Sequence, residues 1–189
     1  MSTYELILGR RSIRRFQKKK VPEELLERCV NAGRLAPSGA NLQPLEFMVV
    51  DKEDLLPKVF ETLQWAAYLD WESGEGERPT AYIAILLNKE INPDASHEVG
   101  MAAENIILTA LEEGVASCCL GSIDRDELRR ILTIPEKFSI ELVIALGYPA
   151  EESFVEEFTS PEYWQEGHTM HIPKKSLESV MHRNIYQSR

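Results

Sequence analysis

The sequence predicts an α+β fold in which a mixed β-sheet is covered by helices. Short apolar segments bounded by glycine or proline, a pattern typical of buried strands, are interleaved with longer segments whose apolar residues recur at helical spacing. The four strand candidates are unevenly spaced and their connections differ in kind, which argues against a doubly wound sheet. At 189 residues, the chain is long enough for one domain with its own core.

The N-terminal part of the chain predicts three helices and one strand. Thr3–Leu8 is a short helix with Ser2 or Thr3 as its cap. Pro22–Leu35 is a longer helix, because proline opens it, acidic residues follow and the apolar residues form one stripe. A loop rich in turn residues leads to the strand Glu46–Val50, and the periodicity of Leu55–Tyr68 predicts the third helix.

The middle of the chain predicts the most deeply buried elements. Glu72–Arg78 is charged and bears glycine, so we expect a loop there, followed by the apolar strand Tyr82–Leu87. Ser96–Glu113 is the longest predicted helix, with Ser96 as its cap and Gly114 just past its end. Its nearly continuous apolar run indicates a central, largely buried helix.

The last part of the chain predicts two strands, two helices and an arm. Ala116–Leu120 is a short strand, and a variant of the capping box opens a helix at Arg125–Leu132. Ile140–Leu146 is another buried strand. From about residue 150 the chain is acidic and is expected to be irregular until a final helix at Ser176–His182.

The composition is that of an ordinary globular protein, with 43% hydrophobic and 28% charged residues. The apolar runs are too short to span a bilayer, and the first residues lack the pattern of a secretory signal. Three cysteines, two of them adjacent, argue against a disulfide framework (Cys29, Cys118 and Cys119). We therefore expect a cytoplasmic protein that acts without a membrane.

Charge is distributed unevenly along the chain. The net charge of −10 argues against binding to nucleic acid. Met1–Lys20 nevertheless carries seven basic residues and one acid, so its local charge is +6 and the remaining 169 residues carry −16. A weaker basic excess lies near the C-terminus. Two basic ends on an acidic body indicate either a focused anion site or a pair of solvated tails, and charge alone does not decide between them.

The usual nucleotide and hydrolase motifs are missing from the sequence. Gly74–Pro79 begins like a dinucleotide-binding glycine motif, but it ends in proline and carries two carboxylates, so we expect a surface loop. His168 and His171 could ligate a metal, yet no further ligand is placed to complete a set, and no metal site is predicted. The adjacent Cys118 and Cys119 lie in an apolar strand, where one or both are expected to be core residues.

One basic segment carries the chemistry of an anion site. Arg10–Phe16 places four guanidinium groups and the hydroxyl of Ser12 within seven residues, and such groups bind phosphate through bidentate contacts. Ile13 and Phe16 supply apolar anchors, so the segment differs from a solvated basic tail.

Two further segments could face a ligand through their backbone. Ala36–Leu45 is a loop with two prolines, and it either presents rigid polar groups to a ligand or is a plain turn. Ala116–Ser122 is a strand that ends in glycine before a capped helix. Gly121 would allow the backbone to approach a flat ligand closely.

Five stretches occur in a characteristic order along the chain. They are RRSIRRF, APSGANLQP, GMAAENIILTALEEGVASCCLGS running into DRDELRRIL, ELVIALGYP, and KKSLESV. Together they resemble the nitroreductase family of flavoenzymes, and the resemblance extends from Tyr4 to Val180. It implies a nitroreductase-like α+β fold, an intertwined homodimer, and FMN bound in each of two interface sites. The whole of 1–189 would then be a single FMN-binding domain with a C-terminal arm from about residue 150.

The resemblance also implies which residues bind FMN. The arginine segment would hold the phosphate and ribityl groups and approach the pyrimidine end of the ring, while the proline-containing loop would reach FMN from the other subunit. The end of the short strand would back the isoalloxazine ring, and the late basic pair would close on the phosphate. In chain order these residues are Arg10, Arg11, Ser12, Arg14, Pro37, Ser38, Gly39, Asn41, Leu120, Gly121, Lys174 and Lys175.

The activity implied by the resemblance is that of an FMN-dependent oxidoreductase. It would take hydride from NADH or NADPH and reduce a small aromatic, quinone-like or nitro-bearing acceptor. This chemistry requires no side-chain acid or base, and no catalytic side chain is nominated. Trp65–Arg78 matches no segment of the family, which leaves the substrate open. Two alternatives remain: other flavin chemistry on the same fold, namely dehalogenation, enone reduction or flavin breakdown, and a non-enzymatic role in binding flavin or an anionic partner.

Overall fold

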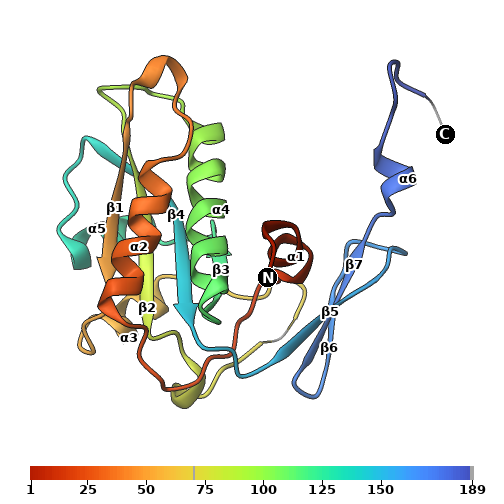
Figure 1. The fold of residues 1–189 in the computed structure, drawn as a ribbon. Coiled ribbons are helices and arrows are strands. Elements are labelled where there is room, and N and C mark those ends of the chain that lie inside the picture. Colours follow the sequence, from red (N-terminus) through yellow and green to blue (C-terminus); the bar gives the residue numbers. More distant parts are fainter. Residues whose placement is uncertain (70, 188–189) are drawn as a thin grey trace.

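The computed structural model describes residues 1–69 and 71–187, and it confirms an α+β fold. Its main sheet has four strands, which are antiparallel to their neighbours and lie in the order β1-β2-β4-β3 (Figure 1). Their bounds are Leu45–Val50 for β1, Ala81–Asn88 for β2, Ala116–Leu120 for β3 and Phe138–Gly147 for β4. Parallel pairing occurs at an isolated bridge from Ser12 to Ser117 and in a second, smaller sheet.

Helices cover both faces of the main sheet. The helices α2 (Glu23–Arg34) and α4 (Ser96–Glu112) pack on one face, where they meet Ile83 and Ile85 of β2. On the other face, α3 (Leu56–Glu61) and α5 (Arg125–Leu132) pack around Tyr82. All eight residues of β2 are buried, which explains why this strand reads as a continuous apolar run rather than an alternating one.

Two predicted features of these helices are wrong. The helix expected to reach Tyr68 ends at Glu61, because the chain beyond it pairs with another loop: Thr62 accepts a hydrogen bond from the amide of Asp124, and Leu63 forms a β-bridge with Ile123. These tertiary contacts override a helical periodicity that is real in the sequence. Ser96 is the first residue of α4 rather than its cap, since Ala95 occupies that position without a side-chain hydrogen bond.

The N-terminal helix α1 spans Thr3–Gly9, and its cap is Ser2. Ser2 and Glu5 form a complete capping box, with each side chain accepting a hydrogen bond from the other's backbone. Figure 1 shows α1 beside the body of the protein, between α4 and the C-terminal strands. Tyr4, Ile7 and Leu8 are exposed on this helix, so it presents an uncovered apolar stripe.

The C-terminal region forms strands where irregular structure is predicted. Its sheet has the order β5-β7-β6, with β5 at Glu152–Glu157, β6 at Trp164–Glu166 and β7 at Thr169–Lys174, and the short helix α6 (Leu177–Val180) follows. Met170 is fully buried, but Phe154 and Val155 are 51% and 45% exposed. The strands thus lack the apolar alternation by which strands are recognised in a sequence.

These strands and α6 form an arm that extends away from the main sheet (Figure 1). Within the described part of the chain, no helix is long and apolar enough to cross a membrane.

Candidate functional site

The basic segment near the N-terminus is fixed to the core by its two apolar residues. Ile13 is 8% exposed, and its amide donates a hydrogen bond to the carbonyl of Ser117 at 2.9 Å. Phe16 is 0% exposed, and it packs so closely on Gly147 that a Cβ built there would lie 2.8 Å from its ring. The segment is therefore held between the edge strand β3 and the chain that leaves β4, and its arginines have defined positions.

Arg14 is the most buried arginine of the segment, with an exposure of 9%. Its guanidinium carbon lies 4.7 Å from the centre of the Tyr163 ring, and its buried Nη1 has no hydrogen-bond partner. Among the described residues, no carboxylate lies within 4.0 Å of its guanidinium nitrogens. A buried cation without a counter-ion is unfavourable in an isolated protein, so this arrangement fits a site that receives an anionic ligand.

Glu151 holds the backbone at Arg14. It is 7% exposed, and its Oε1 accepts a hydrogen bond from the amide of Arg14 at 2.5 Å, while its buried Oε2 has no partner. Burial raises the pKa of Glu151 above its ordinary value, and the amide groups of Arg14 and Arg15 partly offset that rise. Sequence reasoning missed this residue, because its environment is created by tertiary packing.

The other predicted residues of the segment lie closer to the surface. Arg10 faces Glu104 of α4, with 3.7 Å between Nε and Oε1. Arg11 donates a hydrogen bond to the carbonyl of Arg10, and its buried Nε has no partner. Burial, followed by the charge of Arg10, lowers the pKa of Arg11 below its ordinary value. Ser12 is half-buried and forms the bridge to Ser117.

Open space lies in front of Gly121, which directly follows the end of β3. Leu120 is 5% exposed, whereas a Cβ built on Gly121 would meet nothing within 4 Å. The carbonyl of Gly121 accepts a hydrogen bond from Arg125 at 3.2 Å. The chain rises about 13 Å from Ser117 to Gly121. The arginine segment therefore lies at one end of this part of the sheet edge, and the open space at Gly121 lies at the other end.

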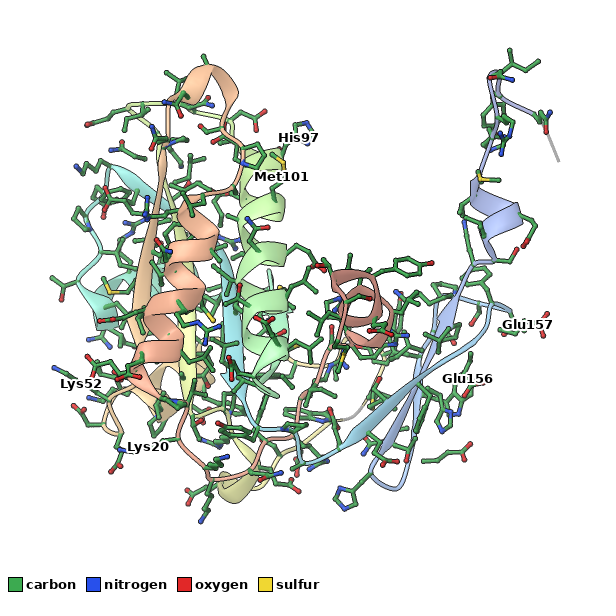
Figure 2. The ribbon with its side chains drawn as sticks, viewed as in Figure 1. Lys20, Lys52, His97, Met101, Glu156 and Glu157 are labelled. Carbon is green, nitrogen blue, oxygen red and sulfur yellow. The ribbon has the colours of Figure 1, made fainter. Side chains whose placement is uncertain are left out.

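The loop of Pro37, Ser38, Gly39 and Asn41 lies at the start of α4. Glu98, which is 7% exposed, accepts a hydrogen bond from the amide of Gly39 at 3.0 Å. The Ser38 hydroxyl accepts one from the amide of Gln43, and Asn41 has a left-handed backbone with φ 57°. Figure 2 labels His97 and Met101 at this end of α4. Glu98 lies between these two residues in the sequence.

Glu98 could have been found from the sequence. It shares a spacing of four residues with Ala102, Ile106 and Ala110, all of which are buried on α4. A carboxylate that continues an apolar helical stripe indicates a buried acceptor that holds another segment of the chain.

One chain does not bring all of the predicted residues together. Arg10 meets α4 at Glu104, which is six residues and about 9 Å of helix beyond Glu98 and the loop. Lys174 is exposed at the end of β7, and Lys175 lies 5.5 Å from the centre of the Phe158 ring. Their roles at FMN stay predictions.

The basic run after Phe16 belongs to a different part of the surface. Lys20 pairs with Glu53 at 2.7 Å, and Figure 2 shows it at the end of the body opposite His97. Lys20 therefore lies apart from the arginines before Phe16, which form the candidate anion site.

The unassigned region from Trp65 to Arg78 forms an aromatic stack. The ring centres of Phe60 and Trp65 are 5.2 Å apart, and those of Trp65 and Trp71 are 5.3 Å apart. Arg78 lies over Phe60 at one end, and Arg15 lies over Trp71 at the other. The stack fastens this segment to the basic segment through cation–π contacts.

The side chains of the two adjacent cysteines differ in burial, as expected for neighbours in a strand. Cys118 is 3% exposed and belongs to the core, whereas Cys119 is exposed. Burial raises the pKa of the Cys118 thiol to about 11, so it is protonated at neutral pH and is not a nucleophile.

Comparison with known proteins gives a consistent result. A family model described as the Nitroreductase family matches residues 7–82 and 77–148, together more than half of the chain. A protein of Archaeoglobus fulgidus, provisionally named NADH dehydrogenase/NAD(P)H nitroreductase, is 34% identical over 158 residues, which cover 78% of this chain and 86% of the relative. An iodotyrosine deiodinase of Thermotoga neapolitana is 24% identical over 163 residues, covering 77% of this chain and 88% of that protein.

The solved structures include an FMN-dependent nitroreductase from Clostridium difficile. It superposes with a TM-score of 0.70 at 24% sequence identity, and the match covers 96% of this chain and 98% of that structure. This likeness supports the α+β fold over nearly the full length of the chain.

Proposed function

Because the chain belongs to the nitroreductase family and is an oxidoreductase of that family, we propose that it binds FMN, takes hydride from NADH or NADPH, and reduces a small acceptor. We further propose that the acceptor is an aromatic, quinone-like or nitro-bearing compound. The observation that supports this proposal most directly is the buried Arg14 guanidinium with an unpartnered Nη1. The expected cytoplasmic location and the division into one domain with an arm stay predictions.

The residues of the site suit FMN. The guanidinium groups of Arg10, Arg11 and Arg14 supply charge for a phosphate and for the electron-rich end of a flavin ring. The open space at Gly121 accommodates a flat ring against the backbone. When bound, FMN supplies the chemistry by accepting and passing on hydride, whereas the protein binds, orients and tunes it.

The protein's own residues would act through position and charge. The amide of Gly121 would donate a hydrogen bond to the ring, and Leu120 behind it would exclude water. Arg14 would stabilise negative charge at the pyrimidine edge through the positive charge of its guanidinium. Lys174 and Lys175 would close on the phosphate.

We propose a homodimer as the functional unit. In one chain the loop of Pro37–Asn41 and the arginine segment contact different turns of α4, and on the pattern of the family the loop would reach FMN from the other subunit. Exposed apolar side chains on α1 and in the arm supply a surface for that partner: Tyr4, Ile7, Leu8, Leu177, Val180, Ile185 and Tyr186. Sedimentation should show a dimer at micromolar concentration, and a flavin-loaded monomer would contradict the proposal.

The decisive test of the function is an absorption spectrum of the purified protein before and after anaerobic addition of NADH or NADPH. We expect a flavin spectrum that bleaches on addition of the nicotinamide, and chromatography of the released cofactor should give FMN. A colourless protein that takes up no added FMN would refute the proposal. Recovery of FAD alone would refute the choice of cofactor.

A second candidate activity is reductive dehalogenation of an aromatic substrate. Relatives named iodotyrosine deiodinase match most of the chain, at 24% identity for the Thermotoga neapolitana protein. Steady-state rates with nitroaromatic, quinone, enone and halogenated phenolic acceptors separate the candidates. Efficient turnover of the halogenated compounds alone would favour dehalogenation.

Gly121→Ala provides a direct test of the ring position. The new Cβ meets nothing within 4 Å and the backbone of Gly121 is not left-handed, so the free energy of unfolding should change by less than about 0.5 kcal/mol. If the ring lies against this backbone, FMN affinity should fall about 10-fold, because a well-fitting surface does not accommodate an added methyl group. Fluorescence titration with FMN measures the affinity. Unchanged affinity would move the ring away from Gly121.

A further inference from the structure

We propose that Glu151 and Tyr163, both in the C-terminal arm, are positioning residues for Arg14, and that the arm thereby sets the affinity of the site for FMN. The inference rests on the proposed function, since it concerns how the site is arranged for that cofactor. It is independent of which acceptor the enzyme reduces. Neither residue was among those that the sequence indicates.

Glu151 fixes the main chain of Arg14. Its carboxylate accepts the Arg14 amide at 2.5 Å, and the neighbouring backbone pairs as well, since the amide of Ala150 donates to the carbonyl of Arg15 at 2.9 Å. Phe16 forms a β-bridge with Pro149 just beyond. The start of the arm and the arginine segment are therefore joined in a short antiparallel arrangement, in which Glu151 is the only charged acceptor for the Arg14 amide that the described residues provide.

Tyr163 fixes the side chain of the same residue. The Arg14 guanidinium lies 4.7 Å from the centre of its ring, and the ring is in turn packed edge-on by Tyr68 at 5.2 Å. A ring face attracts the cation without neutralising it or using its N–H donors. The guanidinium is thus held in place while the buried Nη1 keeps an unused N–H donor.

Holding Arg14 in advance should strengthen ligand binding. A free arginine side chain has many rotamers, and binding must otherwise restrict them. Contacts that restrict them beforehand, without consuming the hydrogen-bonding capacity of the guanidinium, raise the affinity for an anion. Glu151 and Tyr163 satisfy both conditions, because Glu151 accepts its hydrogen bond from the backbone amide and Tyr163 contacts the guanidinium through its ring face.

The experiment is a set of FMN titrations of the full-length protein, followed by quenching of FMN fluorescence. Glu151→Ala should weaken binding about 10-fold, whereas Glu151→Gln should stay within about 3-fold of the wild type, because its amide oxygen accepts the same N–H. Tyr163→Leu should weaken binding about 5-fold, and Tyr163→Phe should bind like the wild type because it keeps the ring face. Rescue by the two conservative variants distinguishes positioning from a general loss of structure.

A double-mutant cycle with Arg14→Ala tests whether both residues act through Arg14. In the Arg14→Ala background, Glu151→Ala and Tyr163→Leu should each weaken FMN binding by less than about 2-fold. Glu98→Ala is the matched control, since Glu98 is equally buried and also accepts a backbone amide, but from Gly39 in the other segment. Its effect should be the same with and without Arg14.

The possible outcomes separate the inference from the proposed function. If the wild type binds FMN and the effects of the arm variants add fully to that of Arg14→Ala, the inference is overturned and the function stands. If the wild type binds no FMN, both are overturned. If Glu151→Ala does not fold, the cycle with Tyr163→Leu decides: loss of its effect in the Arg14→Ala background supports the inference, and full additivity overturns it.

Discussion

Replacing Arg14 by alanine is expected to lower the midpoint potential of bound FMN by roughly 20–45 mV. The reduced flavin carries more negative charge than the oxidised one, so a neighbouring cation stabilises the reduced form selectively. Loss of about 1–2 kcal/mol of such stabilisation, the scale of a partly buried hydrogen bond to a charged group, corresponds to that shift in a two-electron couple. Equilibrium redox titration with excess FMN measures the shift.

The structure explains why Arg14 should have this effect. Arg14 is buried, and among the described residues its guanidinium lies over an aromatic ring and forms no ion pair with a carboxylate. The low polarity around a buried cation also strengthens its interaction with an anionic ligand. We therefore expect Arg14→Ala to weaken the binding of oxidised FMN as well, by about 10-fold, and of reduced FMN by more.

Arg10→Ala is the matched control for this prediction. The Arg10 side chain is 28% exposed, and Glu104 lies beside it, so much of its charge is already compensated by the protein and solvent. We expect weaker binding of FMN in both redox states and little change in the potential. A shift with Arg10→Ala and none with Arg14→Ala would reverse the roles assigned to the two residues.

The buried elements of the fold were predictable because their stability comes from local sequence patterns. β2 is apolar throughout and buried on both faces, and α4 extends from Ser96 to Glu112, one residue short of its predicted end. The cap at Asp124, which opens the predicted capping-box helix, was also readable, and Ser2 was one of the two predicted caps of α1. Each cap needs only one side chain and an amide three residues on.

The parts that failed depend on contacts between distant segments. The backbone beyond Glu61 leaves the helix to pair with residues 122–124, and nothing in the local periodicity indicates that partner. The arm forms strands with few buried apolar side chains, so its sequence gives no alternating pattern. The sequence therefore predicts the conformation of a segment when the pattern lies within that segment. It fails when pairing with a distant segment determines the conformation.

In the candidate site too, some residues could be recognised from the sequence and others could not. The arginines and the loop of Pro37–Asn41 were identified by their residue types, but the glutamates that hold them, Glu151 and Glu98, were not. Glu98 leaves a trace in the helical stripe of α4, whereas Glu151 lies in irregular chain, where no periodicity marks a buried residue. Residues that bind a ligand are easier to recognise than residues that hold the binding segment.

Phe16→Ala is expected to lower the free energy of unfolding by about 3–5 kcal/mol. Phe16 is fully buried, and its ring packs against Gly147 at the end of β4, so removing it leaves a cavity that the backbone around it cannot close. This is a large part of the total stability of a typical domain, which is about 5–15 kcal/mol. Urea unfolding of the apoprotein at a fixed protein concentration measures the change.

Phe16→Leu is the graded control, and added FMN tests whether the anchor also serves the site. Leucine retains most of the buried apolar surface, so the loss should be below about 1.5 kcal/mol. Because FMN binds only the folded protein, FMN at a hundredfold excess over its Kd should stabilise the wild type by about 2.7 kcal/mol. At that same FMN concentration the gain should be smaller for Phe16→Ala, since Arg14 lies two residues from the lost anchor. An equal gain in both proteins would show that the arginine segment keeps its position without Phe16.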